Sequence, residues 1–473
     1  MDYVSTRDGR PRPECVQFED VLLRGLAPDG GLYVPARWPR LAPEELRRLH
    51  GRPYAEIAAA VIAPFLGDLL TPAQLRQILE ETYRNFAHEA VAPLNQVSAD
   101  LWLLELFHGP TLAFKDYALQ LVGRLFEEVL ERRGRRLTII GATSGDTGSA
   151  AIEACRDRAN LDIFMLYPEG RISAVQRRQM TSVAAANVHA IAIQGSFDDC
   201  QDLVKAMFAD ATFRAEFSLS AVNSINWARI MAQTVYYFVA GIALGAPACE
   251  IAFTVPTGNF GNIYAAHVAR LMGLPIARLV IASNRNDILA RFFDGGPMRL
   301  RPVEPSLSPS MDIQISSNFE RLLFDLEGRH GAAVATAMAT FRNTGTLPFG
   351  AGVAETARKL FTAHRTDDDA TLDEIGETWR RDGVLLDPHS AVGLAAARRA
   401  GTLPGVPMVA LATAHPAKFP EAIAQATGLA PEPPSRLAAV MTRPERMVHL
   451  ANELISVQDY VRAHARPRAG VAA

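Results

Sequence analysis

The chain has 473 residues, of which 49% are hydrophobic and 21% are charged, a composition that is ordinary for a globular enzyme of two or three domains. The net charge of −3 and the lack of a long basic stretch argue against nucleic-acid binding. Four widely spaced cysteines form no CxxC pair, which excludes a zinc ribbon, gives no reason to expect a metal, and suits a reducing cytoplasm. Because no apolar run reaches membrane-spanning length and the first residues show no signal peptide, we expect a cytoplasmic protein without a membrane partner.

Predicted secondary structure alternates along most of the chain. Residues 1–95 have helical patterns interrupted by prolines and indicate an accessory domain. The expected elements that follow are strand 101–107, helix 112–133, strand 137–142, helix 147–157, strand 162–167, helix 173–185, strand 188–194, helix 198–214, helix 225–244, strand 250–255, helix 262–272, strand 278–283, a long loop excursion with helices at 371–381 and 390–400, strand 408–412, and a helix from about 420. Strands separated by helices of this length indicate βαβ units and a parallel sheet.

Lys115 is the most informative single residue. It lies in the first turn of a predicted helix directly behind a strand, at the sheet edge where open α/β proteins bind ligands. Only four of the 48 basic residues are lysines, and the others are arginines. An arginine cannot replace an amine that must lose its proton and attack a carbonyl carbon. Lys115 is therefore a candidate Schiff-base residue, and the alternative is an exposed lysine near a helix N-terminus, which fits Lys205 and Lys359 well.

Two glycine-containing loops follow predicted strands. GATSGDTG at 141–148 offers helix N-terminal amides and the hydroxyls of Thr143, Ser144 and Thr147, which together suit an anion. PTGNFGN at 256–262 has the same strand, loop and helix arrangement. Neither loop matches a nucleoside triphosphate or dinucleotide motif, so a single phosphate group fits better. Each loop could also be a plain capping turn.

A third loop, TAHPAKF at 413–419, places a hydroxyl, a histidine and one of the rare lysines within a few residues. A lone histidine such as His415 is usually structural. For Lys418 the rarity of lysine favours a function, and we expect it to bind an anionic substrate group. An amine nucleophile together with a cradle for one phosphate is the minimum description of a pyridoxal phosphate site.

Motifs over nearly the whole chain resemble those of the threonine synthase family, in its long fungal and bacterial branch. They are YVSTR at 3–7, LLRGLAPDGGLYVP at 22–35, ELFHGPTLAFKD at 105–116, TSGDTG at 143–148, PTGNFGN at 256–262, ISSNFERLLF at 315–324 and ATAHPAKF at 412–419. The resemblance implies an α/β fold of the tryptophan synthase β-like class (pyridoxal phosphate fold type II), with two open twisted α/β lobes. Its implied domains are an N-terminal accessory domain at 1–95, a large cofactor-binding domain at 96–130 and 226–473, and a small α/β domain at 131–225.

The resemblance also implies a role for each motif residue. The residues expected to bind pyridoxal 5′-phosphate are Lys115, Gly258, Asn259, Phe260, Gly261, Asn262 and Thr413. Those expected to contact the substrate are Thr143, Ser144, Asp146, Thr147 and Lys418. Lys115 would hold the cofactor as a Schiff base and then serve as acid and base, and Thr413 would face the ring nitrogen. Many members of the wider fold type carry Asn where this chain has Asp146, so the role of Asp146 stays open.

The implied activity is that of a pyridoxal phosphate-dependent carbon–oxygen lyase of threonine biosynthesis, which converts O-phospho-L-homoserine and water to L-threonine and phosphate. We expect a monomer or a homodimer. One alternative is a phospholyase that acts on the same or a similar phosphorylated amino acid and releases 2-oxobutyrate and ammonia. Another is a non-catalytic homologue that binds a phosphate ligand. The motifs do not separate synthase from phospholyase, because the two differ in the access of water to one intermediate.

Overall fold

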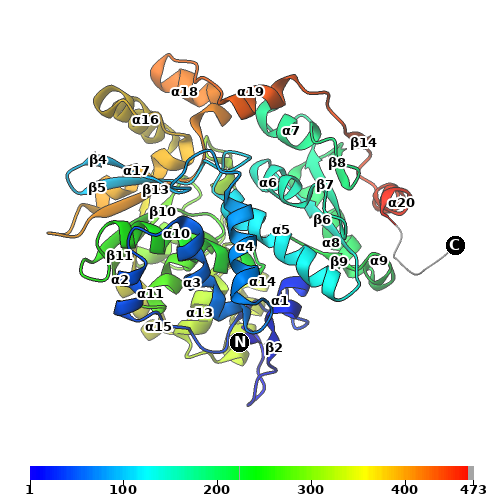
Figure 1. The fold of residues 1–473 in the computed structure, drawn as a ribbon, viewed down its shortest axis with the longest axis horizontal. Helices are drawn as coiled ribbons and strands as arrows, with labels where there is room; N and C mark the ends of the chain where they lie inside the picture. The colour runs from blue at the N-terminus through cyan, green and yellow to red at the C-terminus, as the bar shows by residue number, and fades with distance from the viewer. Residues whose placement is uncertain (223, 467–473) are drawn as a thin grey trace. The chain divides into compact units, whose positions relative to one another are not determined.

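The structure, a computed structural model, describes residues 1–222 and 224–466, and the chain divides into two compact units (Figure 1). Unit 1 consists of Met1–Val21, Leu26–Phe114 and Ser224–Pro431, and unit 2 of Leu22–Gly25, Lys115–Asn223 and Glu432–Ala473. The finer division into three domains with limits at residues 95, 130 and 225 stays a prediction.

A six-stranded sheet forms the centre of unit 1, in the order β12-β11-β10-β13-β5-β4. The strands are β4 (Leu94–Ser98), β5 (Leu101–Glu105), β10 (Ile251–Pro256), β11 (Ile276–Ser283), β12 (Phe361–Arg365) and β13 (Met408–Ala412). All neighbouring strands are parallel except β4 and β5, which are antiparallel. The connection between β4 and β5 is too short for a parallel crossover, which explains this exception. The carboxyl ends of the other five strands therefore lie at one edge of the sheet.

Helices cover this sheet. Helix α17 (Pro388–Ala400) packs on β10, β11 and β13, and its small residues allow the close approach. The other helices of the unit are α2 (Pro43–Arg48), α3 (Tyr54–Leu66), α4 (Pro72–Tyr83), α10 (Trp227–Ala243), α11 (Gly261–Leu271), α12 (Ile288–Phe293), η1 (Pro309–Met311), α13 (Phe319–Leu326), α14 (Gly331–Thr344), α15 (Ala351–Leu360), α16 (Asp368–Asp382), η2 (Pro416–Lys418) and α18 (Pro420–Thr427). The central strands β10 and β13 are fully buried and mostly apolar because a parallel sheet is covered on both faces, whereas the edge strands β4 and β12 carry polar, partly exposed residues.

The first 35 residues contain a three-stranded antiparallel sheet in the order β2-β1-β3, where only helices were expected. Its strands are β1 (Asp2–Ser5), β2 (Val16–Gln17) and β3 (Tyr33–Pro35), and α1 (Phe18–Arg24) follows β2. Strands of two to four residues are too short to show an alternating pattern in sequence. The buried carboxylate of Glu320 in α13 binds the segment after β1. Arg7 donates to it through Nε at 2.9 Å and through Nη2 at 2.7 Å.

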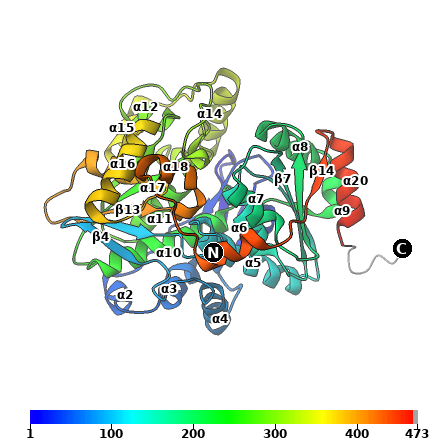
Figure 2. The ribbon, with the colours of Figure 1, turned by 90° about the horizontal axis from the view of Figure 1, so that it is seen from above.

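Unit 2 has a five-stranded, fully parallel sheet in the order β14-β8-β7-β6-β9. The strands are β6 (Leu137–Ala142), β7 (Leu161–Pro168), β8 (Val188–Ile193), β9 (Leu219–Ser220) and β14 (Val448–Leu450), and the helices are α5 (Lys115–Arg132), α6 (Asp146–Cys155), α7 (Ala174–Thr181), α8 (Phe197–Ala209), α9 (Ala211–Phe217), α19 (Ser435–Thr442) and α20 (Leu454–His464). Figures 1 and 2 show α5 and α6 on one side of this sheet, and α8, α9 and α20 on the other. Covering both faces is the arrangement that an all-parallel sheet requires.

The alternating elements expected between residues 101 and 283 are present, but some bounds differ, and β9 was not expected. The helix expected at 112–133 begins only at Lys115, because Leu112 adopts a positive φ of 62° within the preceding loop. The helix expected at 198–214 is divided into α8 and α9 at Asp210, whose carboxylate accepts hydrogen bonds from the N–H groups of Thr212 and Phe213 at 3.0 Å and so caps α9.

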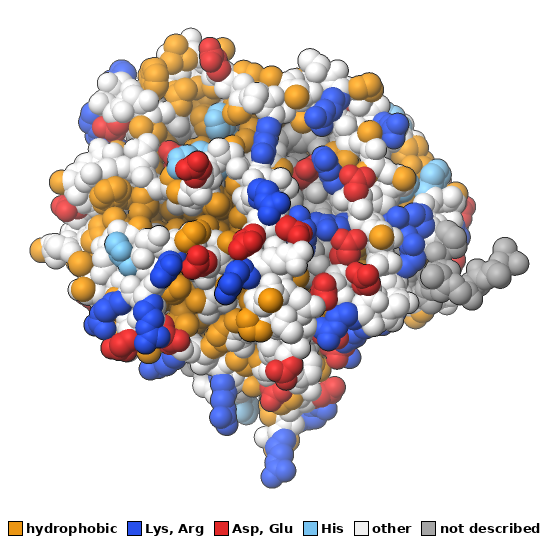
Figure 3. All heavy atoms as spheres, in the orientation of Figure 1, with side chains coloured by type: hydrophobic (Ala, Val, Ile, Leu, Met, Phe, Trp, Pro, Cys, Tyr) orange, Lys and Arg blue, Asp and Glu red, His pale blue; other side chains and the backbone are white. Residues whose placement is uncertain are grey.

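The face of the molecule in Figure 3 shows no large patch of purely basic or purely acidic side chains. Basic and acidic side chains are interspersed there, with apolar side chains between them (Figure 3). Among the described residues, no helix combines the length and the hydropathy that crossing a bilayer requires.

Burial of His267 makes stability depend on pH. This histidine lies in α11 with 4% of its surface exposed, and burial lowers the pKa of its imidazole to about 4. The folded state therefore resists protonation, so its contribution to stability is complete above the ordinary pKa near 6.5 and is lost as the pH falls toward 4. For His267→Phe we expect the loss of unfolding free energy between pH 7 and pH 5 to be smaller than in the wild type by roughly 2 kcal/mol.

Urea unfolding at the two pH values measures this difference. Phenylalanine keeps the ring that packs between Tyr264 and Phe361 at centroid distances of 5.9 and 5.8 Å. His50→Gln, at an exposed position, is the control and should keep the wild-type pH dependence. If wild type and His267→Phe lose the same unfolding free energy between pH 7 and pH 5, His267 is not the source of the pH dependence.

Candidate active site

Three loops of unit 1 begin beside one another at the carboxyl edge of the six-stranded sheet. Strand β13 pairs in parallel with both β10 and β5, so the loops that follow these strands adjoin. Main-chain hydrogen bonds join the loop after β5 to the loop after β13: Phe114 N donates to Thr413 O at 2.9 Å, and His415 N donates to Leu112 O at 3.0 Å. The position that the sequence indicated for a ligand is thus built from paired strands.

The loop after β10 presents a row of main-chain amides. Within the described residues, the N–H groups of residues 258–262 have no hydrogen-bond acceptor. The carbonyl groups point elsewhere, because Gly258 O accepts from Ser316 Oγ at 2.6 Å and Asn259 O accepts from Asn318 N at 3.1 Å. In a trans peptide the following N–H points in the opposite direction. The amides therefore remain available to an anion at the N-terminus of α11.

The side chain of Asn262 adds a further donor to this loop. The hydroxyls of Tyr236 and Tyr237 both donate to its Oδ1, the latter at 2.7 Å. Burial raises the pKa of both tyrosines well above the ordinary value, so both keep their protons and act as donors. The buried Nδ2 of Asn262 has no partner within the described residues. An unpaired buried amide is costly, which favours a ligand that accepts from it.

The loop after β13 holds Thr413 and Lys418 in different ways. Thr413 is buried, its N–H donates to Ser390 Oγ at 2.9 Å, and within the described residues its hydroxyl has no hydrogen-bond partner. Lys418 is fully buried, and its Nζ donates to Thr111 O at 2.9 Å. The Thr413 hydroxyl is therefore available to a ligand, whereas the Lys418 amine already binds the loop after β5.

His415 matches its structural interpretation. Its Nδ1 accepts a hydrogen bond from Ala417 N at 3.1 Å, and its ring contacts Phe107 edge-on at a centroid distance of 5.4 Å. Burial lowers the pKa of its imidazole to about 4, and the neighbouring His108 acts in the same direction. His415 is thus a neutral residue that shapes the loop.

In unit 2, a buried ion pair joins the starts of two helices. Lys115 is the first residue of α5 and Asp146 is the first residue of α6, and both are at least nine-tenths buried. Lys115 Nζ lies 3.5 Å from Asp146 Oδ2, and Gln176 Nε2 donates to Asp146 Oδ1 at 3.0 Å. The carboxylate is thus offset by a cation, an amide and the helix N-terminus.

The other predicted residues of this unit form the loop before α6. The Oγ1 of Thr143 accepts from Gly145 N at 3.0 Å and from Gly148 N at 2.8 Å, so Thr143 shapes the turn. Ser144 and Thr147 are partly exposed, and within the described residues their hydroxyls have no hydrogen-bond partner. These two are the hydroxyls of the loop that are available to a ligand.

The predicted residues thus form two sets, one in each unit. Unit 1 brings together residues 258–262, Thr413 and Lys418, and unit 2 brings together Lys115, Asp146 and the 143–147 loop. The chain joins the two sets directly, because Phe114, which is bonded to Thr413, precedes Lys115.

Sequence analysis missed several residues that support these sets. They are Gln176, Tyr236, Tyr237, Ser316, Asp387, His389 and Ser390. Gln176 and Asp387 could have been found from local sequence. Ser173 and Gln176 form a capping box, and Asp387 followed by Pro388 is typical of a helix start. The tyrosines and Ser316 carry no such signal, because only tertiary contacts give them a role.

Three family descriptions match successive parts of the chain. Residues 87–342 match the family described as pyridoxal-phosphate dependent enzyme, residues 2–83 match threonine synthase N terminus, and residues 390–461 match threonine synthase, C-terminal. A curated threonine synthase of Pseudomonas aeruginosa is 55% identical over 465 residues, which cover 98% of each chain. The chain belongs to the threonine synthase family.

Solved threonine synthases share the fold. A crystal structure of the pyridoxal phosphate-bound enzyme from Brucella melitensis has a TM-score of 0.95 and 52% identity, with 98% of this chain and 100% of that chain covered. The yeast enzyme has a TM-score of 0.92 and 37% identity, with 98% of each chain covered. The predicted fold class, α/β of pyridoxal phosphate fold type II, is confirmed.

Membership of the threonine synthase family makes the protein a pyridoxal phosphate-dependent carbon–oxygen lyase. Its residues fit that cofactor. The free amides of residues 258–262 and the buried Nδ2 of Asn262 suit a phosphate group, and the free hydroxyl of Thr413 suits a ring nitrogen. Lys115 supplies a buried amine. That these particular residues bind the cofactor remains our proposal.

A side chain at Gly258 would crowd its surroundings. A Cβ at this position would lie 3.0 Å from Ser310 O and 3.1 Å from Ile313 Cδ1. Gly258→Ala should therefore displace the amide row and weaken cofactor binding about tenfold, since overpacking costs about 1–3 kcal/mol. Titration of the apoenzyme with pyridoxal phosphate, followed by absorbance, measures the change.

Gly352→Ala serves as the matched control. A Cβ at this exposed position of α15 would meet no atom within 4 Å, so cofactor affinity should stay at the wild-type value. Wild-type affinity in Gly258→Ala would contradict the assignment of the phosphate site.

Proposed function

We propose that this enzyme converts O-phospho-L-homoserine and water to L-threonine and phosphate, in the cytoplasm, as a monomer or a homodimer. The observation that carries the proposal is the buried amine of Lys115, 3.5 Å from the carboxylate of Asp146. Family membership supports the reaction, and the chemistry of both sets of residues supports a small phosphorylated substrate.

The reaction asks for a series of proton transfers. Protons leave the α and β carbons of the substrate, phosphate leaves the γ carbon, the γ carbon takes up a proton, the hydroxyl of water adds to the β carbon, and the α carbon regains a proton. Bound pyridoxal phosphate supplies the conjugated system that withdraws electrons from the carbanions. Lys115 supplies the amine that takes the α proton and returns it.

The residues around Lys115 have distinct parts in this proposal. Asp146 orients the amine by charge, and Gln176 holds the carboxylate in place through its 3.0 Å hydrogen bond. Ser144 and Thr147 bind the substrate through their available hydroxyls, and Thr143 keeps the loop in shape for them. Lys418 remains a proposed contact for an anionic group of the substrate.

Product analysis tests the proposal. The enzyme is incubated with O-phospho-L-homoserine, and threonine, phosphate and 2-oxobutyrate are measured. We expect threonine and phosphate in equal amounts. Lys115→Ala should lower the rate at least about a thousandfold, which is within the range for removal of a general acid–base group. Lys359→Ala is the matched control, because that lysine is exposed and forms an ion pair with the exposed Glu355 at 2.8 Å.

Three outcomes would defeat the proposal. A predominance of 2-oxobutyrate would identify a phospholyase. Wild-type protein that gains no absorbance band with pyridoxal phosphate would identify a non-catalytic homologue. A band and a turnover unchanged in Lys115→Ala would remove Lys115 from its role.

A further inference from the structure

Asp387 is a fully buried carboxylate at the N-terminus of α17 that contacts two neighbouring side chains as well as the main chain. Its Oδ1 accepts from Ser390 N at 3.1 Å and from Ser390 Oγ. Its Oδ2 accepts from His389 N at 3.0 Å and contacts His389 Nδ1 at 2.7 Å. A single carboxylate thus fixes the orientation of a serine and a histidine in the first turn of one helix.

The serine leads to Thr413. Because the hydroxyl hydrogen of Ser390 is donated to Asp387, its oxygen is oriented to accept the N–H of Thr413 at 2.9 Å. The carbonyl of Thr413 is held in turn by Phe114 N at 2.9 Å. The main chain of Thr413 is therefore bound on both sides, while its hydroxyl stays available.

The histidine leads to the segment behind Gly258. His389 Nε2 accepts from Ser310 N at 3.3 Å, which requires the proton of a neutral ring to be on Nδ1, where Asp387 accepts it. Ser310 and Ile313 belong to the segment that a Cβ at Gly258 would strike. We call residues 306–313, which lie against Gly258, the wall. The bond from Ser310 N to His389 therefore holds the wall in place.

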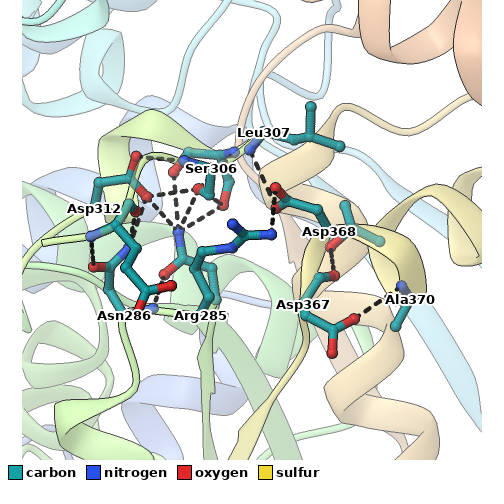
Figure 4. Close-up of polar contacts among 12 residues, drawn as sticks. Arg285, Asn286, Ser306, Leu307, Asp312, Asp367, Asp368 and Ala370 are labelled. Carbon is teal, nitrogen blue, oxygen red and sulfur yellow. Dashed lines mark hydrogen bonds and ion pairs between the residues drawn. The ribbon is translucent and has the colours of Figure 1, made fainter.

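The same wall is also held by a second polar cluster. Asp312 Oδ1 accepts from Ser306 Oγ at 2.6 Å and from Asn286 Nδ2 at 3.0 Å, and Oδ2 accepts from Ser306 N at 2.9 Å (Figure 4). This cluster attaches residues 306–313 to the end of β11. The bond from Ser310 to His389 attaches the same segment to α17.

We propose that Asp387 is a positioning residue that sets both ends of the cofactor site at once. Through Ser390 it positions Thr413, whose hydroxyl would face the ring nitrogen of the cofactor. Through His389 it positions the wall behind Gly258, whose loop would bind the cofactor phosphate. This inference rests on the proposed roles of Thr413 and Gly258. A residue that only caps a helix needs to accept from the main chain alone, whereas Asp387 also binds the side chains of Ser390 and His389.

Two probes separate the two ends. The apoenzyme is titrated with pyridoxal phosphate and with pyridoxal, which lacks the phosphate. His389→Phe should weaken binding of pyridoxal phosphate about tenfold, comparable to the loss of other supporting hydrogen bonds around a site, and should leave pyridoxal binding unchanged. His389→Gln should restore much of the affinity, because its carbonyl oxygen can accept the Ser310 N–H.

Ser390→Ala tests the other end. It should shift the absorbance spectrum of the bound cofactor and the pH dependence of that spectrum, because the hydroxyl facing the ring nitrogen moves. The ratio of pyridoxal phosphate to pyridoxal affinity should stay within about twofold of wild type, since this variant leaves the phosphate wall in place. Asp387→Ser, which keeps a capping hydroxyl, should show both effects together.

Asp367→Ser provides the matched control. Asp367 caps α16 through Ala370 N at 3.1 Å, and the two residues lie together in Figure 4. This variant makes the same exchange of a capping carboxylate for a capping hydroxyl, and it should keep wild-type affinities and spectrum. If Asp387→Ser behaves like Asp367→Ser, Asp387 is only a cap and the inference is overturned.

The outcomes also separate this inference from the proposed function. A wild-type protein that fails to bind pyridoxal phosphate or to form threonine defeats the proposed function. An active wild type whose His389 and Ser390 variants match it in both titrations and in spectrum defeats only the role of Asp387. The His389 and Ser390 variants decide the question even if Asp387→Ser does not fold.

Discussion

The parallel pairing of β5, β13 and β10 is the constraint on which the site of unit 1 depends. Residues 408–410 of β13 are each in register with a residue on both neighbours, such as Ala410 with Thr254 and with Leu103. A shift by one residue would turn every buried side chain to the opposite face. The apolar sheet therefore fixes the register, and the register fixes where the loops begin. The positions of the amides after β10 and of the Thr413 hydroxyl after β13, which have no partner in the described part of the chain, follow from this pairing.

The second constraint is electrostatic and belongs to unit 2. Removing a lysine and an aspartate from water is costly, and the pair persists because each partner offsets the charge of the other. Both residues begin helices, so the positive end of α6 favours the carboxylate of Asp146, and Gln176 satisfies its other oxygen. The role of Asp146, which the sequence left open, acquires a physical basis: it stabilises and orients the amine on which the proposed chemistry depends.

The sequence predicts best where local pattern and tertiary structure agree. The alternation between residues 101 and 283 is strong because each buried strand is a continuous apolar run, and glycine loops after such strands are visible without a structure. Strand β12 and helices α13 to α15 lie in a segment whose prolines and glycines indicated a loop, since tertiary packing outweighs local propensity there. Asp387, His389 and Ser390 were missed because a capping motif does not show which distant loops it will hold.

The structure gives a specific reason for a lysine at position 418, which sequence composition alone could not supply. The rarity of lysine predicted that an amine was needed at this position, and the structure gives one physical reason. Its Nζ donates to the carbonyl of Thr111, four residues before Lys115, from a fully buried position. An arginine would bring a planar fork of five donors into this space, and each buried donor would need an acceptor. Lys418 and the bonds that Phe114 and His415 make all connect the loop after β5 to the loop after β13. These contacts hold the last residues of the unit 1 segment that ends at Phe114.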